Sequence, residues 1–573
     1  MRDFLSYRAR IEPDGEALVV ADGGDVYTFG NLDTLVDDLA GRLVAAGVAP
    51  GDHLGAVLES RLEYVCLIHA AMRLGVTLVP MGDELTPREL AGQLDTADVT
   101  SVVCGAETER AVVDAIARIE ADAADAVGSG ESDDADDAES APASGSDPRP
   151  ESRTDAESGF EFEPESESIA VLTVDDPATD RGVALSETPV AEVSPAEWSL
   201  DRTQLILFTS GTTGDPKAVR LTVRNLLASA VASVFRLGLD PADRWFATLP
   251  LHHMGGLAPV LRLPLYGMTV VLRESFEAGP AVDDLDRYDV TAVSLVPTML
   301  DRMLDRRGTL PESLRVVLLG GAPASADLIE RCQAYSVPVH PTYGMTETAS
   351  QIATARPREA FRAPDSVGRP LLFTDVTIVD ADGDPREPGD PGEIVVDAPT
   401  VTPGYYGNPE ATEDAFGRFG FHTGDVGVRD EDGTLRVLNR LDDRIVSGGE
   451  NVDPGEVAEV FRSHPGVVEA AVVGVPDAEW GERVSALVVG DGDDPDRAEL
   501  LSFARDRLAA YKVPKTVAFA DSLPRTVSGT VDREAVRERL SGGDGDRTAA
   551  AEESGPADVD GADDPPPSGD ADD

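Results

Sequence analysis

The stretch from Leu207 to Thr222 constrains the fold more than any other part of this chain. It reads Leu-Phe-Thr-Ser-Gly-Thr-Thr-Gly-Asp-Pro-Lys-Ala-Val-Arg-Leu-Thr. The apolar run from Leu205 to Phe208 predicts a buried strand, which opens into a loop of hydroxyls and glycines. Glycines permit tight turns whose backbone N–H groups point at an anion, so the loop predicts a polyphosphate site. The residues expected to hold phosphate are Thr209, Ser210, Gly211, Thr212, Thr213, Gly214 and Lys217.

Lysine is so scarce in this chain that Lys217 stands out. The only other lysines are Lys512 and Lys515, and the remaining basic side chains are arginines. A Gly/Thr-rich surface loop would account for a short fragment of the stretch, but not for the whole of it. The P-loop of nucleoside triphosphatases is excluded, because the required Gly-Lys-Ser/Thr does not follow here.

The 207–222 stretch closely resembles the phosphate-binding motif of adenylate-forming enzymes. This superfamily includes acyl-CoA synthetases, luciferases and peptide-synthetase adenylation domains. Further motifs similar to those of the superfamily follow in order down the chain, and only an acidic insert and the C-terminal tail fall outside the resemblance. It implies an α/β fold, with a large layered N-terminal adenylate-forming domain and a small mobile α+β C-terminal domain.

Length and charge bound the function. A chain of 573 residues predicts two or more domains, and its formal net charge of −59 repels nucleic acid and anionic membranes, so we expect neither as a partner. The acidity suits either a protein that binds partners through its charge or adaptation to a high-salt host. Arginine in place of lysine suits the second reading, although GC-rich coding would look similar. The composition is compatible with a homo-oligomer of this chain.

The chain shows no sign of export. The three cysteines are few and widely spaced, so we expect reduced thiols rather than disulfides or a metal cluster. The N-terminal residues lack an apolar signal region, and no segment approaches transmembrane length. These features predict a soluble, cytoplasmic protein.

The pattern along the chain predicts its organisation. Residues 1–440 form the expected N-terminal domain, with one helical face beginning behind Asn31 as its cap. A segment of about 122–168, rich in Asp, Glu, Ser and Gly, predicts a disordered insert on a surface loop. Residues 441–541 form the expected mobile domain, and residues 542–573 a similar acidic tail. The alternative for both acidic segments is a charged docking arm.

The segment from His340 to Thr348 carries the second strong motif. The ring of Tyr343 can stack on a purine, and Gly344 allows close backbone approach. Thr346 offers a hydroxyl to a phosphate oxygen, and Glu347 is an oxygen ligand suited to Mg²⁺. The superfamily's motif has these same roles. Upstream, Gly321 lies in a Gly-Gly-Ala-Pro segment that resembles the one flanking the adenine.

Further matches extend into the C-terminal region. Asp425 follows a Thr-Gly turn, and an ionised carboxylate can accept both ribose hydroxyls, which is the role that the resemblance implies. The match also implies that Arg440 binds ribose or phosphate and that Asp442 is the hinge. Gly448 and Gly449 match the region that lines the pantetheine tunnel, which favours a CoA-thioester-forming member over a luciferase. The implied cofactors are ATP, CoA and Mg²⁺.

The acyl pocket has its own set of candidates. The segments around His253 and Arg262, with the motif that continues through Ser350, are most similar to the 2-succinylbenzoate–CoA ligases of menaquinone biosynthesis. The match places His253 beside the acyl group, with His252 facing solvent. We expect Arg262 to hold the second carboxylate of the substrate, and its alternative is a snorkelling arginine at a helix edge.

One departure bears on catalysis. The last motif of the superfamily ends in a lysine that reaches the forming acyl phosphate, but this chain has Thr530 there. Losing one such donor typically costs about two to three orders of magnitude in rate. Lys512, Lys515 or Arg533 could substitute, adenylation could rest on Lys217 and Mg²⁺, or the first half-reaction is impaired. Thr530 raises one alternative to the predicted ligase, a non-catalytic binder of nucleotide or acyl-adenylate. The other alternative is a fatty-acyl or aryl-CoA ligase with a different acyl pocket.

Overall fold

The computed structural model divides the chain into two compact units. One runs from the N-terminus to Asp442 and includes Arg525, and the other runs from Asp443 to Pro524 and resumes at Val531. The residues described are 3–129, 168–197, 199–209, 216–443, 445–447, 450–452, 454–477, 480–490, 492, 495–505, 507–525 and 531–541, without the side chains of 125–129, 442, 446, 450 and 451. Among these residues no helix has the length and apolar character needed to cross a bilayer.

The first unit contains a nine-stranded sheet, whose central strands are parallel. Strand β13 (Val316–Leu319) is apolar throughout and buried at every position, as expected for a parallel strand covered on both faces. The order across the sheet is β16 (Arg369–Pro370), β15 (Ser350–Thr354), β14 (Val339–Met345), β13, β12 (Ala292–Leu295), β10 (Arg244–Ala247), β11 (Thr269–Leu272), β1 (Glu16–Val20) and β2 (Asp25–Thr28).

A second sheet of seven strands carries the glycine- and threonine-rich loop. Its edge is formed by β9, which runs antiparallel to β8. The order is β7 (Val183–Ala184), β6 (Ala170–Thr173), β5 (Ser101–Cys104), β3 (His53–Val57), β4 (Thr77–Pro80), β8 (Thr203–Thr209) and β9 (Lys217–Thr222). The strand expected at 205–208 is therefore present, and it ends where the loop begins.

A third sheet of five strands completes the first unit. Its strand β20 pairs antiparallel with β18, β19 and β21, so this sheet is antiparallel. The members are β17 (Asp375–Val379), β18 (Gly392–Asp397), β19 (Phe416–Gly417), β20 (Gly420–Arg429) and β21 (Leu435–Arg440).

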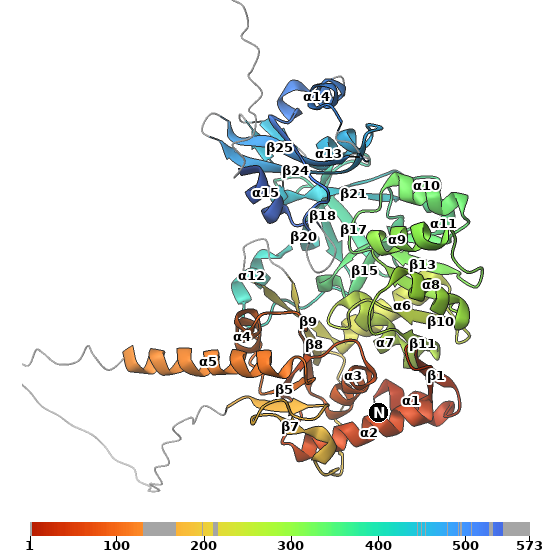
Figure 1. Ribbon diagram of the computed structural model, residues 1–573, viewed down its shortest axis with the longest axis vertical. Helices are drawn as coiled ribbons and strands as arrows, with labels where there is room; N and C mark the ends of the chain where they lie inside the picture. The colour runs from red at the N-terminus through yellow and green to blue at the C-terminus, as the bar shows by residue number, and fades with distance from the viewer. Residues whose placement is uncertain are drawn as a thin grey trace, which may run out of the picture. The chain divides into compact units, whose positions relative to one another are not determined.

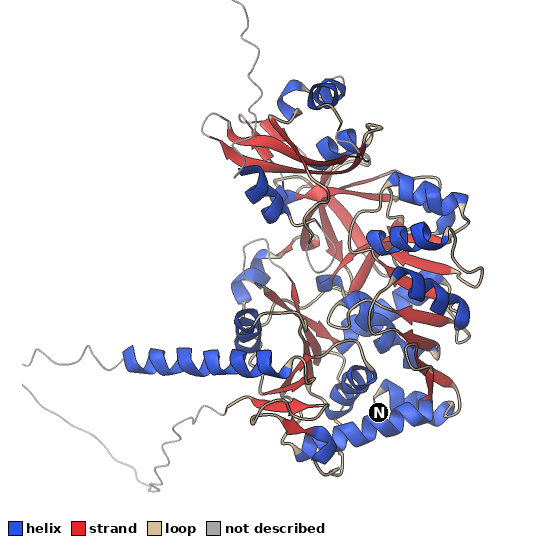
Figure 2. Ribbon diagram, viewed as in Figure 1, coloured by secondary structure: helices blue, strands red, loops and turns tan. Residues whose placement is uncertain are grey.

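Helices cover the sheets of the first unit, as Figures 1 and 2 show. They are α1 (Phe4–Ile11), α2 (Phe29–Ala45), α3 (Leu62–Leu74), α4 (Pro87–Thr96), α5 (Glu109–Ser129), α6 (Val223–Leu237), α7 (Met254–Tyr266), α8 (Ala278–Arg287), α9 (Pro297–Arg307), α10 (Ala326–Ala334), α11 (Pro357–Ala360) and α12 (Pro409–Asp414). The layered α/β class expected from the sequence is confirmed.

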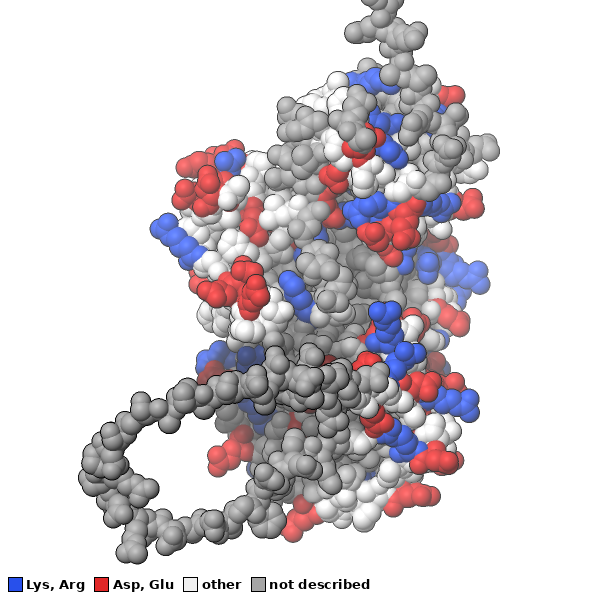
Figure 3. Space-filling view, turned by 90° about the vertical axis from the view of Figure 1, so that its left-hand side faces the viewer, with Lys and Arg blue, Asp and Glu red and all other residues white. Residues whose placement is uncertain are grey.

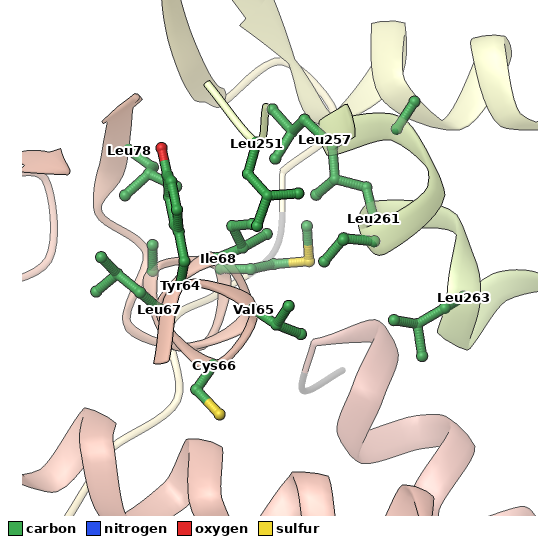
Figure 4. Packing of buried hydrophobic residues seen from close by; sticks show 14 of the residues in the cluster. Tyr64, Val65, Cys66, Leu67, Ile68, Leu78, Leu251, Leu257, Leu261 and Leu263 are labelled. Atoms are coloured by element: carbon green, nitrogen blue, oxygen red, sulfur yellow. The ribbon is translucent and has the colours of Figure 1, made fainter. Parts of the chain in front are cut away.

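Successive residues of the large sheet face two separate cores. On β11, Val270 belongs to the cluster that includes α2, α3 and α7, whereas Val271 belongs to the cluster under α8, α9 and α10. This follows from the two-residue repeat of a strand, which points neighbouring side chains to opposite faces. Figure 4 shows the first cluster, in which Leu257 and Leu261 of α7 lie near Ile68 of α3.

Two local expectations were wrong. Asn31 is not the N-cap of α2, because the cap is Thr28 and Asn31 is the third helical residue of a capping box. The acidic insert was placed too early, since α5 continues through Ser129, where alanines sustain the helix. In Figure 1 this helix extends away from the rest of the unit. The remainder of the insert and the 542–573 tail lie outside the described residues.

The second unit is a small α+β module. Its sheet has the order β23 (Glu450–Val452), β22 (Ile445–Ser447), β25 (Gly481–Gly490) and β24 (Val467–Asp477), with β26 (Thr516–Phe519) beside β25. Its helices are α13 (Pro454–Arg462), α14 (Arg497–Arg505) and α15 (Arg533–Ser541). Phe461 and Leu500 from the first two helices are fully buried with Val484 of β25. This unit therefore has a core of its own.

Candidate active site

The strands that flank the 210–215 loop bring its two ends together. β8 and β9 pair antiparallel, with Thr209 opposite Lys217. Both residues are half-buried. Of the predicted phosphate-binding residues, the structure therefore places Thr209 and Lys217 side by side. The others, Ser210, Gly211, Thr212, Thr213 and Gly214, lie outside the described residues.

A tight turn at the end of β14 presents the second motif. A Cβ atom on Gly344 would lie 1.7 Å from the backbone oxygen of Ser350, so no other residue fits without moving the backbone. The short 3₁₀ helix η2 (Thr346–Thr348) follows, with Thr346 half-buried and Glu347 buried. Just beyond it, Ala349 and Ser350 have φ values of 51° and 119°, which non-glycine residues seldom adopt. Such strain is typical of functional sites.

The tyrosine and the aspartate of two distant motifs are joined directly. The hydroxyl of Tyr343 donates to Oδ2 of Asp425 at 2.6 Å, and Nε of Arg440 lies 3.1 Å from Oδ1 of the same carboxylate. Arg440 stands opposite Asp425 because β20 and β21 pair antiparallel. A second bond, from Nη2 of Arg440 to the backbone oxygen of Thr423, holds the guanidinium in place.

Tyr405 links Glu347 to Lys217. Its hydroxyl lies 3.2 Å from Oε1 of Glu347, and Nζ of Lys217 lies 5.1 Å from the centroid of its ring. The sequence reasoning missed Tyr405, which lies outside the motifs it used. Its place in a Pro-Gly-Tyr-Tyr-Gly turn between two strands was the available signal. Through Tyr405 the structure brings Lys217 and Glu347 to one place.

Burial governs the charges of this site. It raises the pKa of Asp425, although Arg440 and the Tyr343 hydroxyl partly oppose the rise. It likewise raises the pKa of Glu347, against the Tyr405 hydrogen bond and the charges of Arg440 and Lys217. The pKa of Tyr343 is also raised well above its usual value, by burial first and then by Asp425. Tyr343 therefore stays a hydrogen-bond donor at neutral pH.

The carboxylate of Glu347 fits a magnesium ion that is held mainly by phosphates. Mg²⁺ takes oxygen ligands and commonly binds one or two carboxylates together with substrate phosphate oxygens and water. Oε1 of Glu347 accepts from the Tyr405 hydroxyl, so the protein itself orients this carboxylate. No group of three or more His, Cys, Asp or Glu suited to a metal occurs among the described residues, so an all-protein metal cage is not found there.

The acyl-pocket candidates lie on and beside α7. His253 is the N-cap residue of this helix and Arg262 lies in its last half. Nη1 and Nη2 of Arg262 bond the hydroxyls of Ser233 and Ser229, and the Ser229 hydroxyl in turn donates to the backbone oxygen of Ala349 at 2.6 Å. Arg262 is 5% exposed, so the snorkelling alternative is wrong. A small cavity beside it also contacts Ala349, the residue that precedes Ser350.

Both histidines before α7 are enclosed. The expectation that His252 faces solvent was wrong, because its side chain is 10% exposed, with Nδ1 3.9 Å from a carboxylate oxygen of Asp83. Its ring lies 4.3 Å from that of His253, centroid to centroid. Burial lowers the pKa of His252 to about 3, and it also lowers the pKa of His253. Both rings are therefore neutral at pH 7.

The remaining candidates are placed in part. Gly321 follows β13 with φ of 80°, where glycine is favoured. Asp442 is the last residue before the division between the two units, and its side chain is not described. Gly448, Gly449 and Thr530 lie outside the described residues.

The candidate substitutes for the missing lysine lie in the second unit. Nζ of Lys512 pairs with Oε2 of Glu456 at 2.5 Å, Nζ of Lys515 lies 4.4 Å from the ring centroid of Trp480, and Arg533 pairs with Asp443. Each of the three thus has a partner within its own unit.

Two family models match this chain. The model for AMP-binding enzymes matches residues 5–406, and the model for the AMP-binding enzyme C-terminal domain matches residues 456–530. The curated 2-succinylbenzoate–CoA ligase of Geobacillus kaustophilus is 38% identical over 532 residues, which cover 92% of this chain and 96% of the relative. The ligase of the same name from Bacillus subtilis is 33% identical and covers 94% and 98%.

Solved structures agree with these matches along nearly their whole length. The o-succinylbenzoate CoA synthetase of Bacillus subtilis, in complex with its acyl-adenylate intermediate, has a TM-score of 0.77 at 32% identity, covering 94% of this chain and 98% of that chain. ATP-bound MatB from Rhodopseudomonas palustris has a TM-score of 0.78 at 28% identity, covering 94% and 99%. The shared family domains, the relatives and the common fold agree, and the chain therefore belongs to the AMP-binding enzyme family.

Proposed function

We propose that this protein is an AMP-forming acid–thiol ligase that converts 2-succinylbenzoate, ATP and CoA into 2-succinylbenzoyl-CoA, a step of menaquinone biosynthesis. The observation that carries the proposal is the convergence of four side chains predicted separately. Lys217 and Glu347 meet through Tyr405, and Tyr343 and Asp425 share a hydrogen bond. The names of the relatives that match along nearly their whole length support the same substrate.

In this proposal one ATP molecule spans the site. The purine stacks on the ring of Tyr343 beside Gly321, and the ribose hydroxyls donate to Asp425, which Arg440 keeps in place. The triphosphate reaches toward Thr209, Lys217 and the hydroxyl of Thr346. Residues 210–215, which the sequence motif assigns to phosphate binding, are expected to act on the same triphosphate.

The first half-reaction needs positioning and charge more than covalent chemistry. The substrate carboxylate attacks the α-phosphorus, the bond to the bridging oxygen breaks, and pyrophosphate leaves with that electron pair. Mg²⁺, when bound at Glu347, neutralises the charge of the triphosphate. Lys217 provides a cation at the start of β9, and Arg440 holds the ribose or α-phosphate side, so the two cations flank the reacting groups.

The buried cation of Arg262 supports a substrate with a second carboxylate. Its partners within the described chain are hydroxyls of Ser229 and Ser233, neither of which carries charge. Burial lowers the pKa of Arg262, so its charge is costly there without an anion. The aromatic carboxylate of 2-succinylbenzoate supplies such an anion. His253 and Ser350 then border the acyl chain on either side.

The second half-reaction completes the cycle. The CoA thiolate attacks the acyl carbonyl carbon, and AMP leaves with the electrons of the mixed-anhydride bond. We place the hinge at Asp442, where the two units divide, and the pantetheine arm along Gly448 and Gly449. The order of the family domains along the chain supports this assignment.

We propose a soluble cytoplasmic enzyme adapted to concentrated salt, acting on small molecules rather than on nucleic acid or membranes. The net charge of −59 supports both parts, since a carboxylate-rich surface stays hydrated where salt screens its self-repulsion. On the face in Figure 3, acidic and basic side chains of the described residues lie interspersed. Measuring ligase activity at increasing potassium chloride concentration tests the salt adaptation, and we expect the activity to rise from dilute to concentrated salt.

The reaction is tested by identifying its products. The purified chain is incubated with ATP, Mg²⁺, CoA and 2-succinylbenzoate in concentrated potassium chloride, and the products are analysed by mass spectrometry. We expect AMP and 2-succinylbenzoyl-CoA, and neither with Lys217→Met. The same assay is repeated with a panel of other acids. If only a fatty or aryl acid yields a CoA thioester, that acid replaces 2-succinylbenzoate as the proposed substrate. Absence of ATP–pyrophosphate exchange with every acid would favour a non-catalytic binder, the alternative that Thr530 raises.

A further inference from the structure

Tyr405 lies on a segment that is anchored to the strand carrying Lys217. Tyr405 forms an antiparallel bridge with Val219 of β9, and the backbone N–H of Tyr406 donates to the oxygen of Ala218 at 2.8 Å. Thr412 reaches back and accepts from the N–H of Tyr405 at 3.0 Å. The backbone of Tyr405 is therefore fixed relative to β9.

The same segment is anchored to Glu347. The backbone N–H of Thr402 donates to the backbone oxygen of Glu347 at 2.7 Å, and the Thr402 hydroxyl donates to the oxygen of Arg220 on β9 at 2.6 Å. Asn225 of α6 holds the preceding turn through the oxygens of Pro399 and Val401. Residues 399–406 thus connect β9 to η2 by backbone bonds.

The side chain of Tyr405 makes two different contacts from this fixed position. Its hydroxyl donates to Oε1 of Glu347, which restrains the orientation of that carboxylate. Its ring lies below the ammonium of Lys217 at 5.1 Å, within the range over which a cation is attracted to an aromatic face. One contact needs the hydroxyl, and the other needs only the ring.

We propose that Tyr405 is a positioning residue that sets Glu347 for the metal through its hydroxyl and Lys217 for the triphosphate through its ring. The inference rests on the proposed binding of ATP and Mg²⁺ and assigns a specific device to it. Both groups act on the same triphosphate but lie 130 positions apart in the chain. A single rigid side chain between them fixes their separation.

A packing role alone is the competing explanation, since Tyr405 is buried and belongs to the main core cluster. The two contacts predict different effects of substitution on ATP binding with and without Mg²⁺, whereas a packing role predicts no such difference. Tyr405→Phe removes the hydroxyl and keeps the ring, whereas Tyr405→Leu removes both. The neighbouring Tyr406 provides the matched control, because its hydroxyl donates to Asp98 at 2.7 Å.

The experiment measures ATP binding by calorimetry without acyl substrate, so that no turnover occurs, first with EDTA and then at increasing Mg²⁺. For Tyr405→Phe we expect ATP affinity in EDTA to stay within about twofold of the natural protein. The gain in affinity on adding Mg²⁺ should fall at least about tenfold, the effect of losing one hydrogen bond to a charged acceptor. Tyr405→Leu should also weaken binding in EDTA, by about two- to fivefold.

Tyr406→Phe should match the natural protein in both conditions, and melting temperatures should show that every variant is folded. Tyr405→Phe with an undiminished Mg²⁺ gain would overturn the inference, as would equal losses in EDTA for Tyr405→Phe and Tyr405→Leu. A natural protein that binds no ATP would instead overturn the proposed function, so the two failures are distinguishable.

Discussion

The hydroxyl of Tyr343 lies 2.6 Å from Oδ2 of Asp425, a residue 82 positions further along the chain. This bond joins the end of β14 in the nine-stranded sheet to β20 in the five-stranded sheet. It turns one carboxylate oxygen toward the aromatic ring and, with Arg440 on the other oxygen, fixes the plane of the carboxylate. A ring for the purine and an acceptor for the ribose are therefore oriented together.

Tyr343→Phe tests this coupling. The ring remains available for stacking, but Asp425 loses the donor that orients it. Since hydrogen bonds to charged groups contribute about 1.5–3 kcal/mol, we expect the KM for ATP to rise about tenfold with a smaller change in kcat. Steady-state kinetics check this. An unchanged KM would mean that the tyrosine hydroxyl does not position the aspartate.

Nucleoside binding should weaken in acid because of Asp425. Burial raises the pKa of this carboxyl group, and only its charged form accepts both ribose hydroxyls. As pH falls toward the raised pKa, the group takes up a proton and adenosine affinity should decrease. Calorimetry with adenosine, which carries no phosphate to titrate, measures the effect. Asp425→Asn should bind weakly at every pH, and a pH dependence retained in this variant would point to another group.

Arg262→Met separates the two carboxylates of the proposed substrate. Removing a charge-assisted partner should raise the KM for 2-succinylbenzoate about 10- to 100-fold and leave the KM for ATP near its original value. The analogue 4-oxo-4-phenylbutanoate lacks the aromatic carboxylate, so its KM should change little. Equal losses for both acids would show that Arg262 supports the hydrogen bond between Ser229 and Ala349 rather than the substrate.

The buried ion pair of Arg73 with Asp3 should contribute to the stability of the first unit. Both side chains are about 1% exposed, and Nε of Arg73 lies 2.9 Å from Oδ2 of Asp3. Arg73→Met leaves a buried carboxylate unpaired and should lower the free energy of unfolding by about 3–5 kcal/mol. Denaturant titration at fixed salt measures this. The control Arg224→Met removes an exposed pair with Asp201 and should cost less than about 1 kcal/mol.

The same pair predicts a direction for the pH dependence of stability. Burial alone would raise the pKa of Asp3, but the hydrogen bonds and charge of Arg73, together with two hydrogen bonds from Ser6, outweigh it and the pKa is lowered. Because the unfolded state takes up the proton first on acidification, stability from this group is present above the unfolded pKa and is lost as pH falls through the folded one. In Arg73→Met this contribution to the pH dependence should disappear. If the free energy of unfolding of the variant fell with acidification as it does in the natural protein, the prediction would be contradicted.

The sequence predicted those parts of the site that lie within contiguous motifs. Tyr343, Gly344 and Glu347 are neighbours, so their residue types and spacing already carry the chemistry, and the strand before Thr209 was visible as an apolar run. The convergence of Lys217, Glu347 and Asp425 was expected from the resemblance. In the structure Tyr405 joins Lys217 to Glu347, and Arg440, which pairs with Asp425, also acts on the charge of Glu347.

Contacts between distant segments were not predictable from local pattern. The bond from Tyr405 to Glu347 depends on how residues 399–406 lie across β9, which no periodicity encodes. The burial of Arg262 and of His252 likewise follows from packing around α7. At a smaller scale, Thr28 and Asn31 are both good capping residues, and only the backbone shows which one is the N-cap.

The most direct test is a crystal structure of the protein grown with ATP and Mg²⁺. We expect one nucleotide, with its purine on the ring of Tyr343, its ribose hydroxyls on Asp425, its phosphates beside Lys217 and a metal ion at Glu347. A nucleotide bound away from these four side chains, or bound with Asp425 facing no part of the ribose, would contradict this expectation.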